Sequence, residues 1–291
     1  MPILPVGLIL ISAFMHAGWN LLVRDQRAGE IFLRMTGIIT ALGILPAIAA
    51  EFLGDPLPAP IWIYMIFGAL FQGTYFFTLS RGYRSGDFTV VYPLGRALPV
   101  LMVALADVVI GRPPNAVGWV GLGMVAGATM LAPLRSLRAI HWAQYWNRNT
   151  FWIVLTALTV VGYTVVDKRG SELLTPGALT AARYALFEMG FSLLAFAAIL
   201  KALRQPMHNE PGRRAWLTAG LAGLLLYGAY WLVLWSYQLT DRASYIIALR
   251  QFSIVLGVIP GVLIFREGAS TLRITAAAII TLGIVLIILG G

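Results

Sequence analysis

The chain has 291 residues, of which 59% are hydrophobic and only 11% charged, whereas soluble domains carry about 25% charged residues. So much apolar surface excludes a soluble protein and indicates an integral membrane protein, and the net charge of +9 does not indicate a nucleic-acid binder because the basic residues are scattered between apolar segments. The absence of cysteine excludes disulfides, thiolate metal sites and cysteine nucleophiles.

Apolar runs long enough to cross a bilayer recur along the whole chain. A membrane-spanning helix needs about 20 such residues. The runs predict an all-α integral membrane protein with ten transmembrane helices, near 3–23, 31–50, 60–80, 89–110, 115–133, 151–167, 177–200, 213–237, 243–265 and 271–289. No basic segment precedes the first run, so we expect a membrane span there and not a cleaved signal peptide.

The basic residues predict which way the chain faces, because cytoplasmic loops are enriched in Lys and Arg. The connections after the odd-numbered helices hold 13 of them: Arg24, Arg27, Arg81, Arg84, Arg135, Arg138, Arg148, Lys201, Arg204, Arg213, Arg214, Arg266 and Arg273. Those after the even-numbered helices hold 4: Arg112, Lys168, Arg169 and Arg242. We therefore expect the odd connections in the cytoplasm and both termini outside, in the inner membrane of the cell.

The sequence repeats itself weakly between its halves. Gly18-Trp19 matches Gly162-Tyr163, Gly73-Thr74-Tyr75 matches Gly228-Ala229-Tyr230, and Arg34 falls opposite Arg183. Five helices are an odd number, so a duplicated five-helix unit must cross the membrane in the opposite direction. The sequence predicts inverted repeats over 1–133 and 151–291, joined by a cytoplasmic linker, 134–150. Inverted repeats are common in secondary transporters, whose substrate sites lie near the midplane.

With these repeats in view, the chain resembles the EamA-type branch of the drug/metabolite transporter superfamily over nearly its full length. The resemblance rests on residues 91–132, which include Tyr92-Pro93-Leu94-Gly95-Arg96, and on residues 247–288. An acidic residue often follows the fourth helix of each half in this family. Here that position is Arg112 in the first half and Glu267 in the second. Residues 15–20, Met-His-Ala-Gly-Trp-Asn, also resemble a branch found beside phosphonate-degradation genes.

Charged residues inside the predicted helices are candidates for function, because each costs at least about 2.5–3.5 kcal/mol at a helix centre. Arg96 and Arg250 each lie roughly 10 Å below the surface at which their helices enter, at about 1.5 Å per residue. The two helices enter from opposite sides, so the pair brackets the midplane. Arg34 and Arg183 form a shallower pair. Each arginine either binds cargo or holds helices together.

Glu188 is a deep acidic residue that either forms an ion pair with an arginine across the bundle or carries a proton. His16 is a second candidate for coupling, or a hydrogen-bonding residue between helices. Arginines outnumber acids inside the predicted bundle, which favours anionic or zwitterionic cargo held by a bidentate guanidinium.

Polar and aromatic side chains complete the predicted binding site. Ser12, His16, Trp19 and Asn20 form one polar stripe, mirrored by Thr156, Tyr163 and Thr164. Aromatic residues of the third and eighth helices either pack or line a cavity; we include Tyr75, Tyr230 and Trp231 in the candidate site. Tyr92 joins them because Pro93 and Gly95 can interrupt its helix. Gly123, Gly127, Gly257 and Gly261 are predicted close-packing positions.

The sequence carries no enzyme signature and no Walker loop, and it implies no cofactor. An intramembrane enzyme and a non-transporting scaffold or sensor are the weaker alternatives. We predict a secondary active transporter for a small anionic or zwitterionic metabolite, coupled to protons or working by exchange; an exporter of aromatic or cationic compounds is the alternative. The expected partners are the small-molecule substrate and the lipid bilayer, with no nucleic acid, in a monomer or homodimer.

Overall fold

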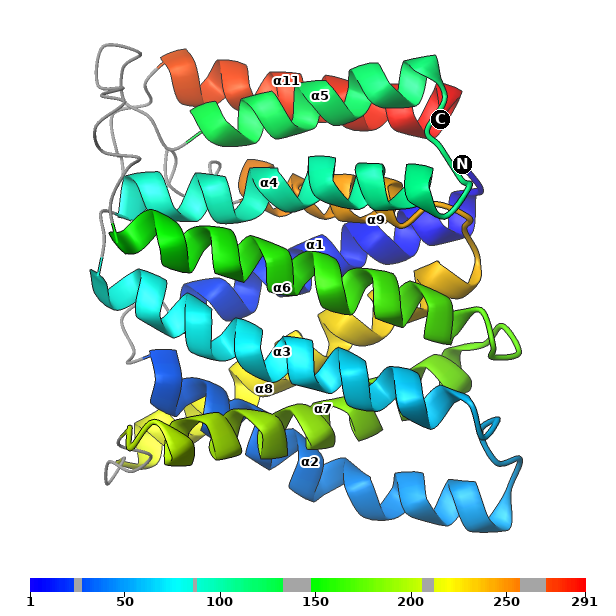
Figure 1. The fold of residues 1–291 in the computed structure, drawn as a ribbon, viewed down its shortest axis with the longest axis vertical. Helices are drawn as coiled ribbons and strands as arrows, with labels where there is room; N and C mark the ends of the chain where they lie inside the picture. Colours follow the sequence, from blue (N-terminus) through cyan, green and yellow to red (C-terminus); the bar gives the residue numbers. More distant parts are fainter. Residues whose placement is uncertain (24–27, 86–87, 133–147, 206–211, 257–270) are drawn as a thin grey trace.

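The computed structural model describes residues 1–291 except 24–27, 86–87, 133–147, 206–211 and 257–270. The described residues form ten helices that lie roughly antiparallel in one bundle (Figure 1). They are α1 (Ile3–Val23), α2 (Ala28–Leu53), α3 (Ile61–Ser85), α4 (Phe88–Val109), α5 (Ala116–Leu131), α6 (Arg148–Ser171), α7 (Ala178–Ala202), α8 (Arg213–Gln238), α9 (Ala243–Arg250) and α11 (Thr271–Gly290).

These helices confirm the predicted all-α membrane fold. Seven of them in the described part of the chain are long and apolar enough to cross a bilayer, and shorter apolar helices accompany them. Large hydrophobic side chains such as Leu45, Leu179 and Leu289 are 71–81% exposed on the outside of the bundle. Such an apolar exterior is suited to lipid and not to water.

Two boundaries differ from the prediction in ways that matter for function. The helix expected to end at residue 167 continues to Ser171, so that Asp167 and Lys168 lie within α6. The helix expected over 243–265 is interrupted, because α9 ends at Arg250 and Gln251 forms a turn before helical residues resume. The predicted span beyond residue 256 lies outside the described residues, as does most of the predicted linker.

The helices pack in pairs that follow the predicted inverted repeat. α1 runs along α8, and its counterpart α6 runs along α3. The remaining counterparts pack against each other: α2 with α7, α4 with α9, and α5 with α11. Figure 1 shows α1 and α6 running in opposite directions. The two halves are therefore interlocked and not separate bodies.

Matching glycines mark equivalent close approaches in the two halves. A Cβ on Gly18 of α1 would lie 3.1 Å from Leu225 of α8, and one on Gly162 of α6 would lie 2.5 Å from Phe71 of α3. The repeat that aligns Gly18 with Gly162 in the sequence thus corresponds to the same helix crossing in each half.

A second pair of equivalent glycines, one in each half, contacts different kinds of side chain. A Cβ on Gly68 of α3 would lie 2.5 Å from Oε1 of Glu188. The equivalent Gly223 of α8 faces α2, where an added Cβ would lie 2.9 Å from the carbonyl oxygen of Met35 and 3.2 Å from Cγ1 of Ile39, the nearest side chain. One half therefore places a carboxyl group where the other places an aliphatic side chain.

The glycines expected to allow close packing in α5 are not the ones that do so. Gly123 and Gly127 face open space, with no atom within 4 Å of an added Cβ. The close approach is at Gly121, where a Cβ would lie 2.7 Å from the carbonyl oxygen of Gly283 on α11. The face of α5 that meets α11 is thus rotated from the predicted one; Gly257 and Gly261 lie outside the described residues.

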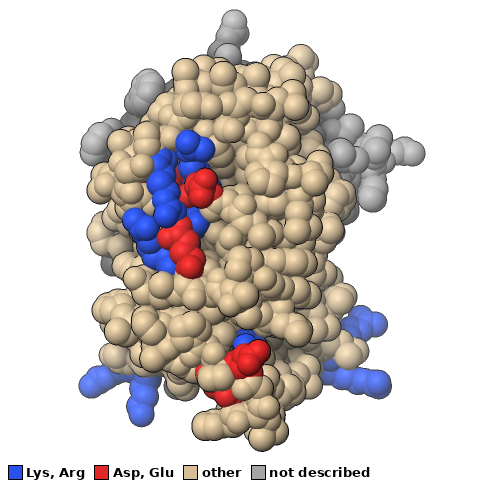
Figure 2. All heavy atoms as spheres, turned by 90° about the vertical axis from the view of Figure 1, so that its right-hand side faces the viewer, with Lys and Arg blue, Asp and Glu red and all other residues tan. Residues whose placement is uncertain are grey.

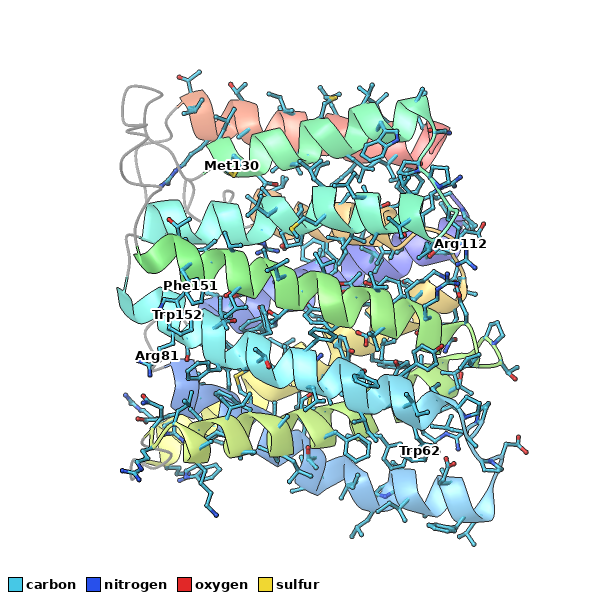
Figure 3. The ribbon with its side chains drawn as sticks, in the orientation of Figure 1. Trp62, Arg81, Arg112, Met130, Phe151 and Trp152 are labelled. Carbon is cyan, nitrogen blue, oxygen red and sulfur yellow. The ribbon has the colours of Figure 1, made fainter. Side chains whose placement is uncertain are left out.

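The two ends of the bundle differ in their side chains. The end that carries both termini, which we call the terminal end, holds Arg112 (Figures 1 and 3). The opposite end holds Arg81, Phe151 and Trp152 (Figure 3). Arg81 lies 5.4 Å from the ring centre of Phe77 and 6.0 Å from that of Trp152. An arginine among aromatic rings is typical of a helix end at a membrane interface.

Candidate functional site

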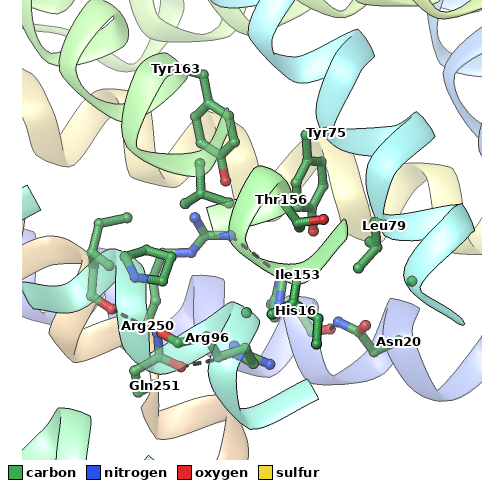
Figure 4. Close-up of a pocket in the computed structure, with 15 residues that line it drawn as sticks. His16, Asn20, Tyr75, Leu79, Arg96, Ile153, Thr156, Tyr163, Arg250 and Gln251 are labelled. Carbon is green, nitrogen blue, oxygen red and sulfur yellow. Dashed lines mark hydrogen bonds between the residues drawn. The ribbon is translucent and has the colours of Figure 1, made fainter. Parts of the chain in front are cut away.

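A central cavity lies among α1, α3, α4, α6 and α9. The space in it that a water-sized molecule can occupy is about 90 Å³. Its polar lining is drawn in Figure 4 and includes Asn20, Tyr75, Arg96, Thr156, Tyr163 and Arg250. Helices of both halves contribute to it, as expected for a substrate site between inverted repeats.

Arg96 is held in this cavity by residues of the other half. Its Nε donates to Oε1 of Gln251 at 3.1 Å, and its Nη2 donates to the hydroxyl of Ser253 at 2.7 Å. The amide of Gln251 in turn donates to the carbonyl oxygen of Arg96 at 3.2 Å. These bonds hold the guanidinium of Arg96 in the cavity and join α4 of the first half to the segment after α9 of the second.

Arg250 reaches the same cavity from α9 of the second half. Its Nη2 lies 3.4 Å from Nδ1 of His16 on α1, and the hydroxyl of Tyr163 points toward it (Figure 4). The indole of Trp19 also donates to Nδ1 of His16, at 3.1 Å. Arg96 from α4 and Arg250 from α9 therefore line one cavity.

A deeper pocket adjoins the central cavity and is lined mostly by aromatic residues. Trp19 and Tyr163 line it from α1 and α6, and Tyr75 and Tyr230 line it from α3 and α8. These are the residues that the internal repeat aligns with each other. The two-fold relation of the halves thus brings four aromatic side chains around one space, with Arg250 at its wall.

The break that helps to shape the cavity is in the second half and not in the first. We expected Pro93 and Gly95 to interrupt their helix, but α4 is continuous over Phe88–Val109. The interruption falls instead after Arg250 of α9. A proline within a membrane helix is tolerated where neighbouring groups satisfy the freed backbone, whereas the turn at Gln251 lets two successive side chains enter the cavity.

Next to the deeper pocket, two carboxyl groups are fully buried together. Asp167 of α6 and Glu188 of α7 are each 0% exposed. The hydroxyl of Tyr230 donates to Oδ2 of Asp167 at 2.6 Å. Glu188 has no salt bridge within the described residues, so the ion pair considered for it is absent there and its neighbour is a second acid.

Two predicted site residues do not line the cavity within the described structure. Arg183 lies near the terminal end, where its Nη1 donates to the carbonyl oxygens of Asp55 at 2.7 Å and Ala50 at 3.3 Å and lies 3.4 Å from Oε2 of Glu51. The indole of Trp231 donates to the carbonyl oxygen of Ala178 at 2.7 Å and so joins α8 to α7. The side chain of Tyr92 lies outside the part of the chain whose side chains are described.

A charged cluster joins the two halves at the terminal end, where Figure 2 shows basic and acidic side chains gathered in one patch. Arg112 of the first half binds the Glu172 carboxylate of the second half, and Lys168 donates to Glu172 at 2.6 Å. Arg242 of the second half donates a hydrogen bond to the carbonyl oxygen of Pro113 in the first half, at 3.0 Å. We call these residues the terminal cluster.

The terminal cluster perturbs the ionisation of its loop residues. Burial by itself would raise the pKa of the Glu172 carboxyl, but hydrogen bonds and charges from Arg112 and Lys168 outweigh it and hold the pKa below its ordinary value. The hydrogen bond to Glu172 raises the pKa of the Arg112 guanidinium. Glu172 therefore stays ionised under neutral and mildly acidic conditions.

Long apolar helices, an inverted repeat and a polar cavity between the halves define a multi-pass membrane transport protein. Residues 3–132 and 148–289 match the family model of the EamA-like transporter family. The chain belongs to this family, whose members transport small molecules and are not enzymes. No comparison supports the finer resemblance to a phosphonate-associated branch.

Comparison with solved structures supports the same fold. One of those found is a crystal structure of a protein with a TM-score of 0.74 and 16% sequence identity, aligned over 97% of this chain and 95% of that chain. At this identity the likeness shows the fold alone. The search of curated proteins found no match.

Proposed function

We propose that the protein is a secondary active transporter that moves a small anionic or zwitterionic organic metabolite across the cytoplasmic membrane. The observation that carries the proposal is the presence of two guanidinium groups, Arg96 and Arg250, in one cavity. Guanidinium groups bind carboxylate or phosphate-like oxygens in bidentate geometry. A carboxylate or phosphate-like group of the cargo would complement the positive charge of these two side chains.

The same geometry supports transport by alternating access. The cavity extends through Leu79 and Thr156 toward the end opposite the termini, while the terminal cluster joins the two halves at the other end. With the basic connections in the cytoplasm, this arrangement is an inward-facing state with both termini outside. Rocking of the halves would open the terminal end and close the other.

A thermal-shift experiment on protein in detergent tests the cargo class. The probes are succinate, lactate, inorganic phosphate, glycine, tryptophan and tetraphenylphosphonium. A probe at 100 times its Kd raises the free energy of unfolding by about 2.7 kcal/mol. We expect anionic or zwitterionic probes to raise the melting temperature, and the R96K and R250K variants to lose most of that shift.

Arg183→Lys is the matched control, because Arg183 is a membrane arginine outside the cavity. Its ligand-induced shift should equal that of the unaltered protein. Stabilisation by tetraphenylphosphonium alone, unaffected by R96K and R250K, would refute the anion proposal and favour an exporter of aromatic cations.

A further inference from the structure

Asp167 and Glu188 share one small space inside the bundle. A Cβ added to Gly68 of α3 would lie 2.5 Å from Oε1 of Glu188 and 2.7 Å from Oδ1 of Asp167. Since both distances start from one point, these two oxygens lie no more than 5.2 Å apart (2.5 + 2.7 Å). Both residues are 0% exposed, so bulk solvent does not screen their charges.

Most oxygens of this pair have no hydrogen-bond partner. Tyr230 donates to Oδ2 of Asp167, but Oδ1 of Asp167 and both oxygens of Glu188 are unpartnered within the described chain. Two adjacent carboxylates in a medium of low dielectric constant cannot both be ionised. A single proton shared between the two carboxyl groups forms a hydrogen bond from one group to the other. The pair then carries one negative charge.

The groups around the pair identify what balances that charge. Arg250 of α9 lines the deeper pocket together with Tyr230, which donates to Asp167, and among the described residues it is the cation whose charge acts on Asp167. The other ionisable side chains described near the pair include tyrosines from α3, α6, α7 and α8: Tyr64, Tyr163, Tyr184, Tyr230 and Tyr237. His16 contacts Arg250 at 3.4 Å.

We propose that Asp167 and Glu188 share a proton and form the proton-binding site of the transporter, and that an anion bound to Arg250 drives the uptake of a second proton. The second part of this inference rests on the proposed anion transport. With the cavity empty, the Arg250 guanidinium balances the one negative charge of the pair.

The coupling follows from the position of Arg250 between two anions. When the oxygens of the cargo bind the guanidinium of Arg250, they neutralise the positive charge that had balanced the carboxyl pair. The negative charge of the pair is then uncompensated, and a second proton binds to the pair. Linkage is reciprocal, so protons increase the affinity for the anion by the same factor. Anion and proton then cross the membrane together, as in a symporter.

Infrared difference spectroscopy tests the shared proton without any ligand. In lipid nanodiscs at neutral pH, we expect the carbonyl stretch of a protonated carboxyl group. It should disappear in Glu188→Gln, because Asp167 alone, beside Arg250 and Tyr230, ionises. It should persist at a shifted frequency in Asp167→Asn, because Glu188 then has no cation to balance its charge.

Glu51→Gln is the control for this experiment, since Glu51 is a membrane carboxylate paired with Arg183. It should leave the band unchanged, and melting curves should show that all three variants fold. Absence of the band in the unaltered protein, or an unchanged band in E188Q, would overturn the shared proton.

Proton uptake on binding tests the coupling. An indicator dye in weak buffer should report about one proton taken up per bound anion, with succinate or phosphate as the probe that shifts the melting curve. A variant with both Asp167→Asn and Glu188→Gln, which has no titratable carboxyl group at this position, should bind the anion without this uptake. Binding without proton uptake in the unaltered protein would overturn the coupling and leave anion transport standing. Failure of every anionic probe to bind would refute the proposed cargo and the coupling with it, while the infrared band still decides whether the proton is shared.

Discussion

Nη2 of Arg250 and Nε1 of Trp19 both approach one atom, Nδ1 of His16, at 3.4 and 3.1 Å. Arginine and tryptophan side chains can only donate hydrogen bonds, so Nδ1 of His16 is the unprotonated nitrogen of a neutral imidazole. His16 thereby ties Arg250 of the second half to α1 of the first. This geometry gives the imidazole the role of an acceptor that positions the guanidinium.

Replacing His16 by alanine should weaken anion binding. The change leaves the donors of Arg250 and Trp19 without their acceptor, and an unsatisfied buried donor costs about 1–3 kcal/mol. We expect the Kd of the anionic probe to rise about tenfold, where 1.4 kcal/mol is a factor of ten. His16→Gln retains an acceptor and should bind nearly as the unaltered protein does. Equal affinity of H16A and the unaltered protein in a thermal-shift titration would contradict the positioning role.

Gly68→Ala should disturb the carboxyl pair. Its Cβ would be forced against Glu188 and Asp167, and overpacking of this kind costs about 1–3 kcal/mol. We expect a lower melting temperature and a shifted carboxyl band. Gly220→Ala on the counterpart helix α8 is the control, since an added Cβ there has no atom within 4 Å. If both variants melt alike, the contact at Gly68 is not tight.

Gly121→Ala should separate α5 from α11. The added Cβ meets the backbone oxygen of Gly283, which cannot rotate away as a side chain does. We expect a loss of about 1–3 kcal/mol in unfolding free energy, measured by thermal melting. Gly123→Ala and Gly127→Ala on the same helix should be neutral or slightly stabilising, because alanine is the better helix former. A destabilised G127A would indicate that the predicted face of α5 is the packed one.

Glu172→Gln should weaken the terminal cluster and change how stability depends on pH. Because folding lowers the pKa of Glu172, its ionised form contributes stability above the unfolded pKa of about 4.3. That contribution is lost as the pH falls through the lower folded pKa. The variant should lose at most about 1 kcal/mol at neutral pH, since the group is partly solvent-exposed, and should show a flatter acid limb in melting curves. A steeper acid limb in the variant would contradict this assignment.

Single introduced cysteines can report the side of the membrane to which the cavity opens, because the chain has no cysteine of its own. Thr156→Cys, at the cavity wall, should react with a membrane-impermeant thiol reagent from the cytoplasmic face only. Thr164→Cys, buried on the same helix toward the terminal end, should stay unreactive. Combining E172Q with T156C should increase labelling from outside, because the terminal end then opens more often. Labelling of T156C from the outer face alone would reverse the proposed orientation.

Most of the fold could be predicted from the sequence because each membrane helix corresponds to a long run of apolar residues. The sequence also predicted that Arg96 and Arg250 bracket the midplane, since opposite entry sides and equal depths place both there, and the structure has both in the lining of one cavity. It missed Asp167, because the adjacent Lys168 and Arg169 resemble a loop and the burial of Lys168 depends on Tyr237 and Glu172, whose positions are fixed only by the folded bundle.

The helix break and the carboxyl pair needed the structure for similar reasons. Nothing at Gln251 signals an interruption, because the residue is neither glycine nor proline, and the turn is stabilised by Arg96 from a distant helix. The contact of Glu188 with Asp167 depends on how α6 and α7 pack around Gly68, which no local pattern encodes.

The two glycines that face Glu188 in one half and Ile39 in the other bear on the energetics of the transport cycle. If inverted repeats were identical, the inward-facing and outward-facing forms would be the same structure viewed from opposite sides of the membrane, with equal free energies. The carboxyl pair occupies only one of the two equivalent positions, so this degeneracy is removed. If the pair binds the proposed proton, the resting preference for one orientation depends on the proton occupancy of this single helix crossing, and substituting residues at the crossing would change the preference without altering the cargo site.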